Sequence, residues 1–121
     1  MINLDQFKEL SQRISAIEAY LKIGEKRIQL QEEELKSQDP DFWNDAKAAE
    51  VKMKHIRNLK YWVATYDELK TLLDDLEVLM EFAKEDSSEE ESVDLLADEL
   101  TKKIEELELK NMLSGEEDAL S

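Results

Sequence analysis

The sequence predicts an all-α fold, an elongated bundle of three long antiparallel helices with coiled-coil-like packing. Only two of the 121 residues are Gly and one is Pro, so the chain has few of the residues that make turns. Charged residues make up 39% of the chain, and apolar residues recur at spacings of three and four. We therefore expect a single helical domain over residues 1–121, with helices at about 4–36, 44–85 and 89–113.

The first expected helix, 4–36, begins with a capping box, in which Asn3 caps the helix and Gln6 follows three residues later. Seven-residue spacing then predicts one continuous apolar seam, formed by Phe7, Leu10, Ile14, Ile17, Leu21, Gly24, Ile28 and Leu35. Within it, three interpretations of Gly24 are open: a close approach of the second helix, a bend, or no structural role. Pro40 disfavours helix at the residue before it, so the helix should end near Lys36.

The second expected helix, 44–85, contains no Gly or Pro and would be about 60 Å long. One apolar seam runs along it at spacings of three and four, formed by Trp62, Tyr66, Leu69, Leu73, Leu76, Met80 and Ala83. A second apolar line lies beside the first and consists of Leu72, Leu79 and Phe82. A face this wide predicts a central helix that covers two partner helices. Asn44 is the expected N-cap.

The third expected helix, 89–113, follows an acidic connector. Its buried face is predicted to consist of Val93, Leu96, Ala97, Leu100, Ile104 and Leu107. Gly115 is the expected stop signal, because glycine is the residue that most often follows the end of a helix. The residues after it begin a new acidic stretch, which is typical of a piece cut from a longer protein.

The residues that several classes of functional site require are missing from this sequence. There is no Cys, and the single His55 cannot by itself hold zinc. No Gly-rich phosphate loop and no nucleophile with a base partner is recognisable. We expect no catalytic, cofactor-binding or metal site, no cofactor and no small-molecule substrate. No apolar run is long enough to cross a membrane, and the sequence is typical of a soluble, cytoplasmic protein.

Charge is distributed unevenly along the chain, whose net charge is −15. Residues 1–66 hold 11 basic and 11 acidic side chains, whereas residues 67–121 hold 5 and 20. Between residues 46 and 60 there are five basic residues and one acid, Glu50, so this stretch is suited to contact phosphate groups. The candidate contact residues are Lys52, Lys54, Arg57 and Lys60. An ordinary solvated helix face is the alternative.

Two aromatic residues, Phe42 and Trp43, occupy the turn between the first two expected helices. Large aromatic side chains in a turn commonly close the end of a helical bundle. The alternative is an exposed aromatic docking site.

Two motifs resemble a known family. Asp39-Pro40-Asp41-Phe42-Trp43-Asn44-Asp45 lies between two long helices, and Leu113-Ser114-Gly115-Glu116-Glu117-Asp118 follows the third. Together with Ala19-Tyr20-Leu21 and Tyr66-Asp67-Glu68-Leu69, they resemble the N-terminal domain of the bacterial release factor 2 family over essentially the whole chain. The chain departs from this family at Lys22, because Asp usually follows the Tyr-Leu pair there.

The resemblance implies a domain of a factor that reads the stop codons UGA and UAA and triggers peptidyl-tRNA hydrolysis on the ribosome. The family's Gly-Gly-Gln and Ser-Pro-Phe motifs are absent from these 121 residues, so the piece itself is expected to be non-catalytic. The implied partners are the ribosome, at the stalk base of the large subunit, and release factor 3.

An alternative of another class is a free-standing acidic coiled-coil adaptor or chaperone-like protein. An adaptor would dimerise through the seam from Trp62 to Ala83, whereas an intramolecular three-helix bundle would be monomeric. A hydrolase acting alone would need a catalytic constellation that the sequence does not contain.

Overall fold

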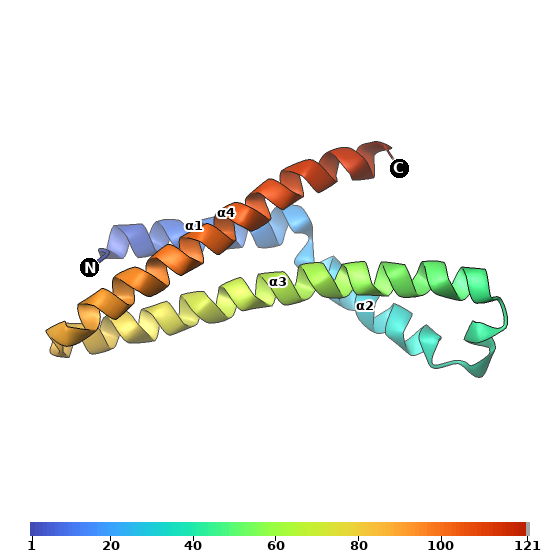
Figure 1. Cartoon of the computed structure of the whole chain (residues 1–121), viewed down its shortest axis with the longest axis horizontal. Helices are drawn as coiled ribbons and strands as arrows, with labels where there is room; N and C mark the ends of the chain where they lie inside the picture. Colours follow the sequence, from blue (N-terminus) through green and yellow to red (C-terminus); the bar gives the residue numbers. More distant parts are fainter. Residues whose placement is uncertain (121) are drawn as a thin grey trace.

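The structure, a computed structural model, describes the backbone of residues 1–120 and the side chains of residues 1–114. Within this range it is all-α, as the sequence predicts, and contains no strand (Figure 1). The elements in chain order are α1 (Leu4–Leu21), α2 (Ile23–Ser37), the 3-10 turn η1 (Pro40–Trp43), α3 (Ala46–Glu85), the 3-10 turn η2 (Ser87–Glu89) and α4 (Glu90–Leu120).

The central helix α3 is confirmed as one uninterrupted helix of 40 residues. It packs against α1, α2 and α4, and it runs along nearly the whole length of the molecule (Figure 1). Its C-terminal half lies with α1 and α4, which we call the three-helix section. Its N-terminal half lies with α2 and η1, which we call the two-helix arm. α3 thus contacts three helices where two were expected, because the expected first helix is divided into α1 and α2.

The prediction of one continuous helix over 4–36 is wrong, because the helix is interrupted at Lys22. The two parts are α1 and α2. Lys22 has φ 54° and ψ 50°, the left-handed conformation that commonly ends a helix. Its N–H donates to the carbonyl of Ala19, and its own carbonyl accepts from the N–H of Lys26. The break redirects the chain, so that α2 runs along the N-terminal half of α3.

The predicted seam of the first helix is correct only before this break. Leu10, Ile14, Ile17 and Leu21 are buried, whereas Ile28 and Leu35 are 60% and 69% exposed. On α2 the buried apolar residue is instead Ile23. Gly24 does not mark a close approach, since a Cβ built there would meet nothing within 4 Å. The bend lies two residues earlier in the chain.

Buried residues form one large core and one smaller set. The large core includes the predicted α3 seam except Met80, which is half-buried and packs against it. From α4 it includes Val93, Ala97, Leu100, Ile104 and Leu107. The smaller set lies on the N-terminal half of α3, at positions whose spacing puts them on one face, and consists of Ala49, Ile56, Leu59 and Val63. This half of α3 packs against α2. The two-helix arm thus consists of α2 packed against the N-terminal half of α3. In the three-helix section, α1, α4 and the C-terminal half of α3 surround one core.

Two expected helix ends are corrected. The N-cap of α3 is Asp45, whose side chain accepts a hydrogen bond from the Ala48 N–H at 3.1 Å. Asn44 precedes it and donates its side-chain amide to Asp41. At the other end, α4 does not stop near residue 113 but continues through Gly115 to Leu120. One glycine costs a helix only about 1 kcal/mol, which is too little to end a long helix by itself.

The turn at the tip of the two-helix arm leaves one of its aromatic side chains in solvent. Phe42 is half-buried, but Trp43 is 58% exposed, and the two rings meet edge to face with centroids 5.0 Å apart. Phe42 therefore fits the expectation of a ring that closes the end of the bundle. Trp43 does not.

Candidate functional site

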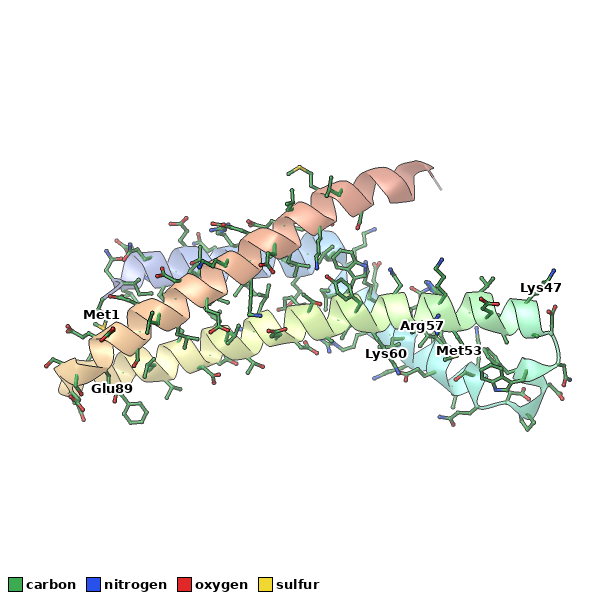
Figure 2. The ribbon with its side chains drawn as sticks, viewed as in Figure 1. Met1, Lys47, Met53, Arg57, Lys60 and Glu89 are labelled. Carbon is green, nitrogen blue, oxygen red and sulfur yellow. The ribbon has the colours of Figure 1, made fainter. Side chains whose placement is uncertain are left out.

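The predicted basic stretch lies on the outer part of α3, in the two-helix arm. Figure 2 shows Lys47, Arg57 and Lys60 along this half, at the end of the molecule far from Met1 and Glu89. The distance between the two ends follows from the unbroken α3, which carries the basic stretch at one end and acidic residues at the other.

Two of the four candidate residues share a surface. Lys54 and Arg57 lie three residues apart, on one side of the helix, and line a shallow open depression together with Val51, His55 and Asn58. Neither cation has a carboxylate within ion-pair distance among the side chains of residues 1–114. Both remain exposed and available to an anionic partner.

The other two candidates point elsewhere and already have partners. Lys60 forms an ion pair of 3.3 Å with Glu34 on α2, and the Nζ of Lys52 lies 5.9 Å from the centroid of the Phe42 ring. Their spacing from Lys54 also places them on different sides of α3. The four predicted contact residues therefore do not form one patch.

A residue that was left out of the prediction belongs with Lys54 and Arg57. Lys47 lies seven residues before Lys54, two helical turns away on the same side, and it is exposed. Helical spacing was the signal that separates this set from Lys52 and Lys60. We call Lys47, Lys54 and Arg57 the basic face. Glu50 lies beside it and leaves a net charge of +2.

Near the break between α1 and α2, a polar cluster ties three helices together. The hydroxyl of Tyr66 on α3 donates to Glu18 on α1, and Arg27 on α2 donates two hydrogen bonds, of 3.0 and 2.9 Å, to Asp67 on α3. These bonds lower the pKa of Asp67. Burial first, and the bond to Glu18 second, raise the pKa of Tyr66 to about 12. The cluster fixes the geometry of the break.

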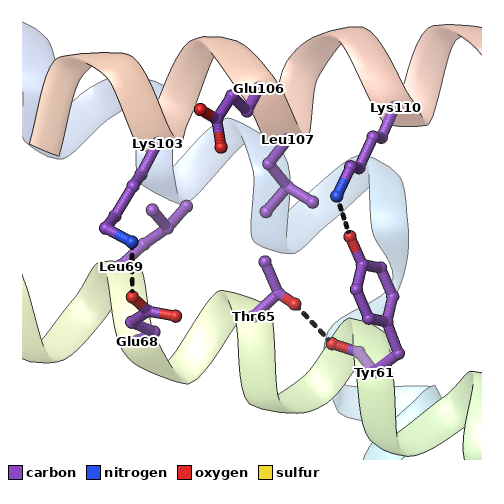
Figure 3. A pocket seen from close by; sticks show the side chains of 8 residues that line it. All are labelled: Tyr61, Thr65, Glu68, Leu69, Lys103, Glu106, Leu107 and Lys110. Carbon is purple, nitrogen blue, oxygen red and sulfur yellow. Dashed lines mark hydrogen bonds and ion pairs between the residues drawn. The ribbon is translucent and has the colours of Figure 1, made fainter.

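A cleft of about 190 Å³ separates α3 from α4 (Figure 3). Across it Lys103 forms a 2.8 Å ion pair with Glu68, and Lys110 donates to the Tyr61 hydroxyl. These contacts raise the pKa of both lysines. Thr65 donates its hydroxyl to the Tyr61 carbonyl. The contacts across the cleft hold α4 against α3.

The described residues contain no group of three or more His, Cys, Asp and Glu side chains placed to hold a metal ion. His55 lies 3.0 Å from the side-chain amide nitrogen of Gln29 on α2. Within the part of the chain that the structure describes, none of the helices combines the length and the apolar character that a membrane crossing requires.

Known proteins resemble this chain over nearly all of its length. The PCRF domain family matches residues 24–121. Peptide chain release factor 2 of Colwellia psychrerythraea is 36% identical over 118 residues, and that of Tolumonas auensis is 35% identical over 118 residues. That of Proteus mirabilis is 32% identical over 116 residues. These alignments cover 96%, 96% and 94% of this chain, but only 32% of each relative.

The chain thus spans about a third of the length of the curated relatives that it matches. The match begins at Gly24, the second residue of α2, and includes the rest of α2 and all of α3 and α4. The chain belongs to the PCRF domain family, and its relatives are bacterial peptide chain release factors 2.

Proposed function

We propose that this chain is the N-terminal, ribosome-binding helical domain of a translation termination factor. The observation that carries the proposal is the match of the PCRF domain over residues 24–121, supported by relatives named peptide chain release factor 2. The basic face supports it independently, because three exposed cations on one side of a helix suit contact with ribosomal RNA phosphates.

The finer part of the proposal concerns the partners. The whole factor would act at UGA and UAA stop codons in the cytoplasm, and this domain would contact the stalk base of the large subunit and release factor 3. The domain itself would be non-catalytic, since its sequence has neither Gly-Gly-Gln nor Ser-Pro-Phe. The acidic C-terminal half would stay clear of RNA, because like charges repel.

The test reverses two charges of the basic face. In the full protein that carries this chain, the double variant Lys54→Glu, Arg57→Glu should weaken binding to ribosomes. Each lost phosphate contact lowers the slope of log affinity against log salt by about 1, so the double variant should lower it by about 2. The measurement is co-sedimentation with ribosomes at several salt concentrations.

A matched control makes the same charge change on the acidic half of the chain. Lys70→Glu, Lys102→Glu also reverses two exposed lysines, neither of which lies near the basic face. It should leave the salt slope unchanged. Equal affinity of the Lys54→Glu, Arg57→Glu variant and the unchanged protein at every salt concentration would remove the basic face from the proposal.

The adaptor alternative loses its main support in this fold. The seam from Trp62 to Ala83, through which an adaptor would dimerise, is covered by α1 and α4 in the large core. Apart from Met80, which is half-buried, a second copy cannot reach these side chains without displacing a helix. We therefore propose that the chain is a monomer.

A further inference from the structure

A groove of about 570 Å³ lies at the end of the molecule opposite the basic face. The N-terminal residues form one wall, with Ile2, Leu4 and Phe7, and α3 forms the other, with Glu77, Met80 and Glu81. Figure 2 shows Met1, which also lines this groove, at the far end of the molecule from Lys47. The residues that line the groove come from the N-terminal residues, α1 and α3.

The floor of this groove is apolar and joins the core. Ile2, Phe7 and Met80 are half-buried and pack against the core cluster, whereas Leu4 remains 59% exposed. Methionine has a flexible, polarizable side chain that adapts to partners of different shape. A groove with such a floor, between two helices, is the form of site into which an amphipathic helix packs its apolar side.

The charge around the groove selects the kind of helix. Residues 77–94 carry eight acidic side chains and one lysine. That lysine, Lys84, lies 3.0 Å from Glu81, and the N-terminal ammonium lies 3.3 Å from Asp94, so the two cations that line the groove are paired. Glu77 has no ion pair among the described side chains. Glu77 is thus the unpaired charge among the residues that line the groove, and the acidic connector makes this end of the molecule negative as a whole.

We propose that this groove binds a basic amphipathic helix of a partner protein. Leu4 and Met80 would receive the apolar side of that helix, and its Lys or Arg residues would face Glu77, attracted by the negative charge of this end of the molecule. A second copy of this chain fits the groove poorly, because it would bring two ends of the same negative charge together.

The experiment uses the four methionines as reporters. The probe is a synthetic helical peptide of leucine and lysine with one apolar side, and the matched control peptide carries glutamate in place of every lysine. Methyl NMR of the methionine-labelled 121-residue chain follows Met80 in the groove, with Met53 on the arm and Met112 on α4 as internal references. We expect saturable shifts of Met80 with the lysine peptide only, and unchanged Met53 and Met112.

Two variants of equal charge separate specific binding from general attraction. Leu4→Glu puts a carboxylate into the groove, and Leu95→Glu puts one on an equally exposed α4 position, 64% exposed, that does not line it. Losing one buried leucine contact should weaken binding about tenfold in the Leu4→Glu variant. General attraction of a cationic peptide would strengthen in both variants, because both are more acidic.

Three results would overturn the proposal: equal shifts of all the methionines, a Leu4→Glu variant that binds as well as the Leu95→Glu variant, or Met80 shifts that follow the concentration of the chain without peptide. The last result would instead indicate self-association. The groove and the basic face share no residue, so the outcome of this experiment is independent of the ribosome-binding test.

Discussion

Tyr66 combines a buried ring with a polar bond at its edge. The residue is 5% exposed within the core, and its hydroxyl reaches Glu18 on α1, one turn before the break at Lys22. A buried tyrosine needs such a partner, since an unpaired hydroxyl in the core costs stability. The apolar seam predicts the burial of Tyr66. It does not predict Glu18 as its partner, because that pairing depends on where α1 ends.

The raised pKa of Tyr66 predicts a loss of stability at high pH. Unfolded tyrosine releases its proton near its ordinary pKa of 10.0, whereas the folded residue keeps it up to about 12. The unfolded state is therefore favoured progressively as the pH rises through this window. Tyr66→Phe should lower the free energy of unfolding by about 1 kcal/mol at neutral pH, through the lost hydrogen bond. It should also flatten the decline between pH 10.0 and about 12.

Urea unfolding of both proteins across this pH range checks the prediction. Glu18→Gln serves as a control. It removes the charge of residue 18 but keeps an oxygen that can accept the hydrogen bond from the Tyr66 hydroxyl. The Tyr66→Phe protein retains some decline, since burial also raises the pKa of Tyr20. Identical pH profiles for the two proteins would show that Tyr66 has no part in the decline.

At the scale of the helices, the break at Lys22 is the feature that sequence patterns missed. Seven-residue spacing continues across it, through Gly24, Ile28 and Leu35, so the pattern predicts one helix. A lysine gives no signal for a left-handed residue, which glycine and asparagine favour. By contrast, α3 was predictable over its whole length, because it has neither Gly nor Pro and its seam is regular.

The conformation of Lys22 predicts that a glycine there would stabilise the protein. An L-residue in the left-handed region costs about 1–2 kcal/mol, and glycine avoids this cost while adding about 0.4–1 kcal/mol of unfolded-state entropy. The side chain of Lys22 is exposed, so its loss removes little packing. We expect Lys22→Gly to raise the free energy of unfolding by about 0.5–1 kcal/mol, measured by urea denaturation.

The opposite sign is expected where the backbone is helical. Lys70→Gly, at an exposed position inside α3, should lower the free energy of unfolding by about 1 kcal/mol. If both glycine variants destabilise the protein, the chain does not adopt the left-handed conformation at residue 22.

For the molecule as a whole, the two-helix arm and the three-helix section differ in how much core they enclose. The arm buries a few side chains between α2 and α3, whereas the section buries three helices around one large cluster. Regions with fewer buried apolar contacts open at lower free energy. Amide hydrogen exchange should therefore be faster in α2 and in residues 46–60 of α3 than in residues 66–85 of α3. Equal protection along α3 would contradict this expectation.

The candidate surface was only half predictable from the sequence. Composition located the basic stretch, and helical spacing alone would have grouped Lys47, Lys54 and Arg57. The partner of Lys60, Glu34, could not be foreseen, because it depends on how α2 lies against α3. The groove near Leu4 was missed for the same reason, since its two walls are separated by about seventy residues of chain and meet only through tertiary packing.

The continuity of α3 has a consequence for how such domains can diverge. Inserting or deleting a single residue near its middle would turn one end by about 100° relative to the other and shift it by about 1.5 Å. The basic face and the groove would then have a different orientation relative to one another. A change of seven residues would keep them within about 20° of their original relation. Indels in relatives with both surfaces should therefore avoid the middle of this helix, or come in steps of seven.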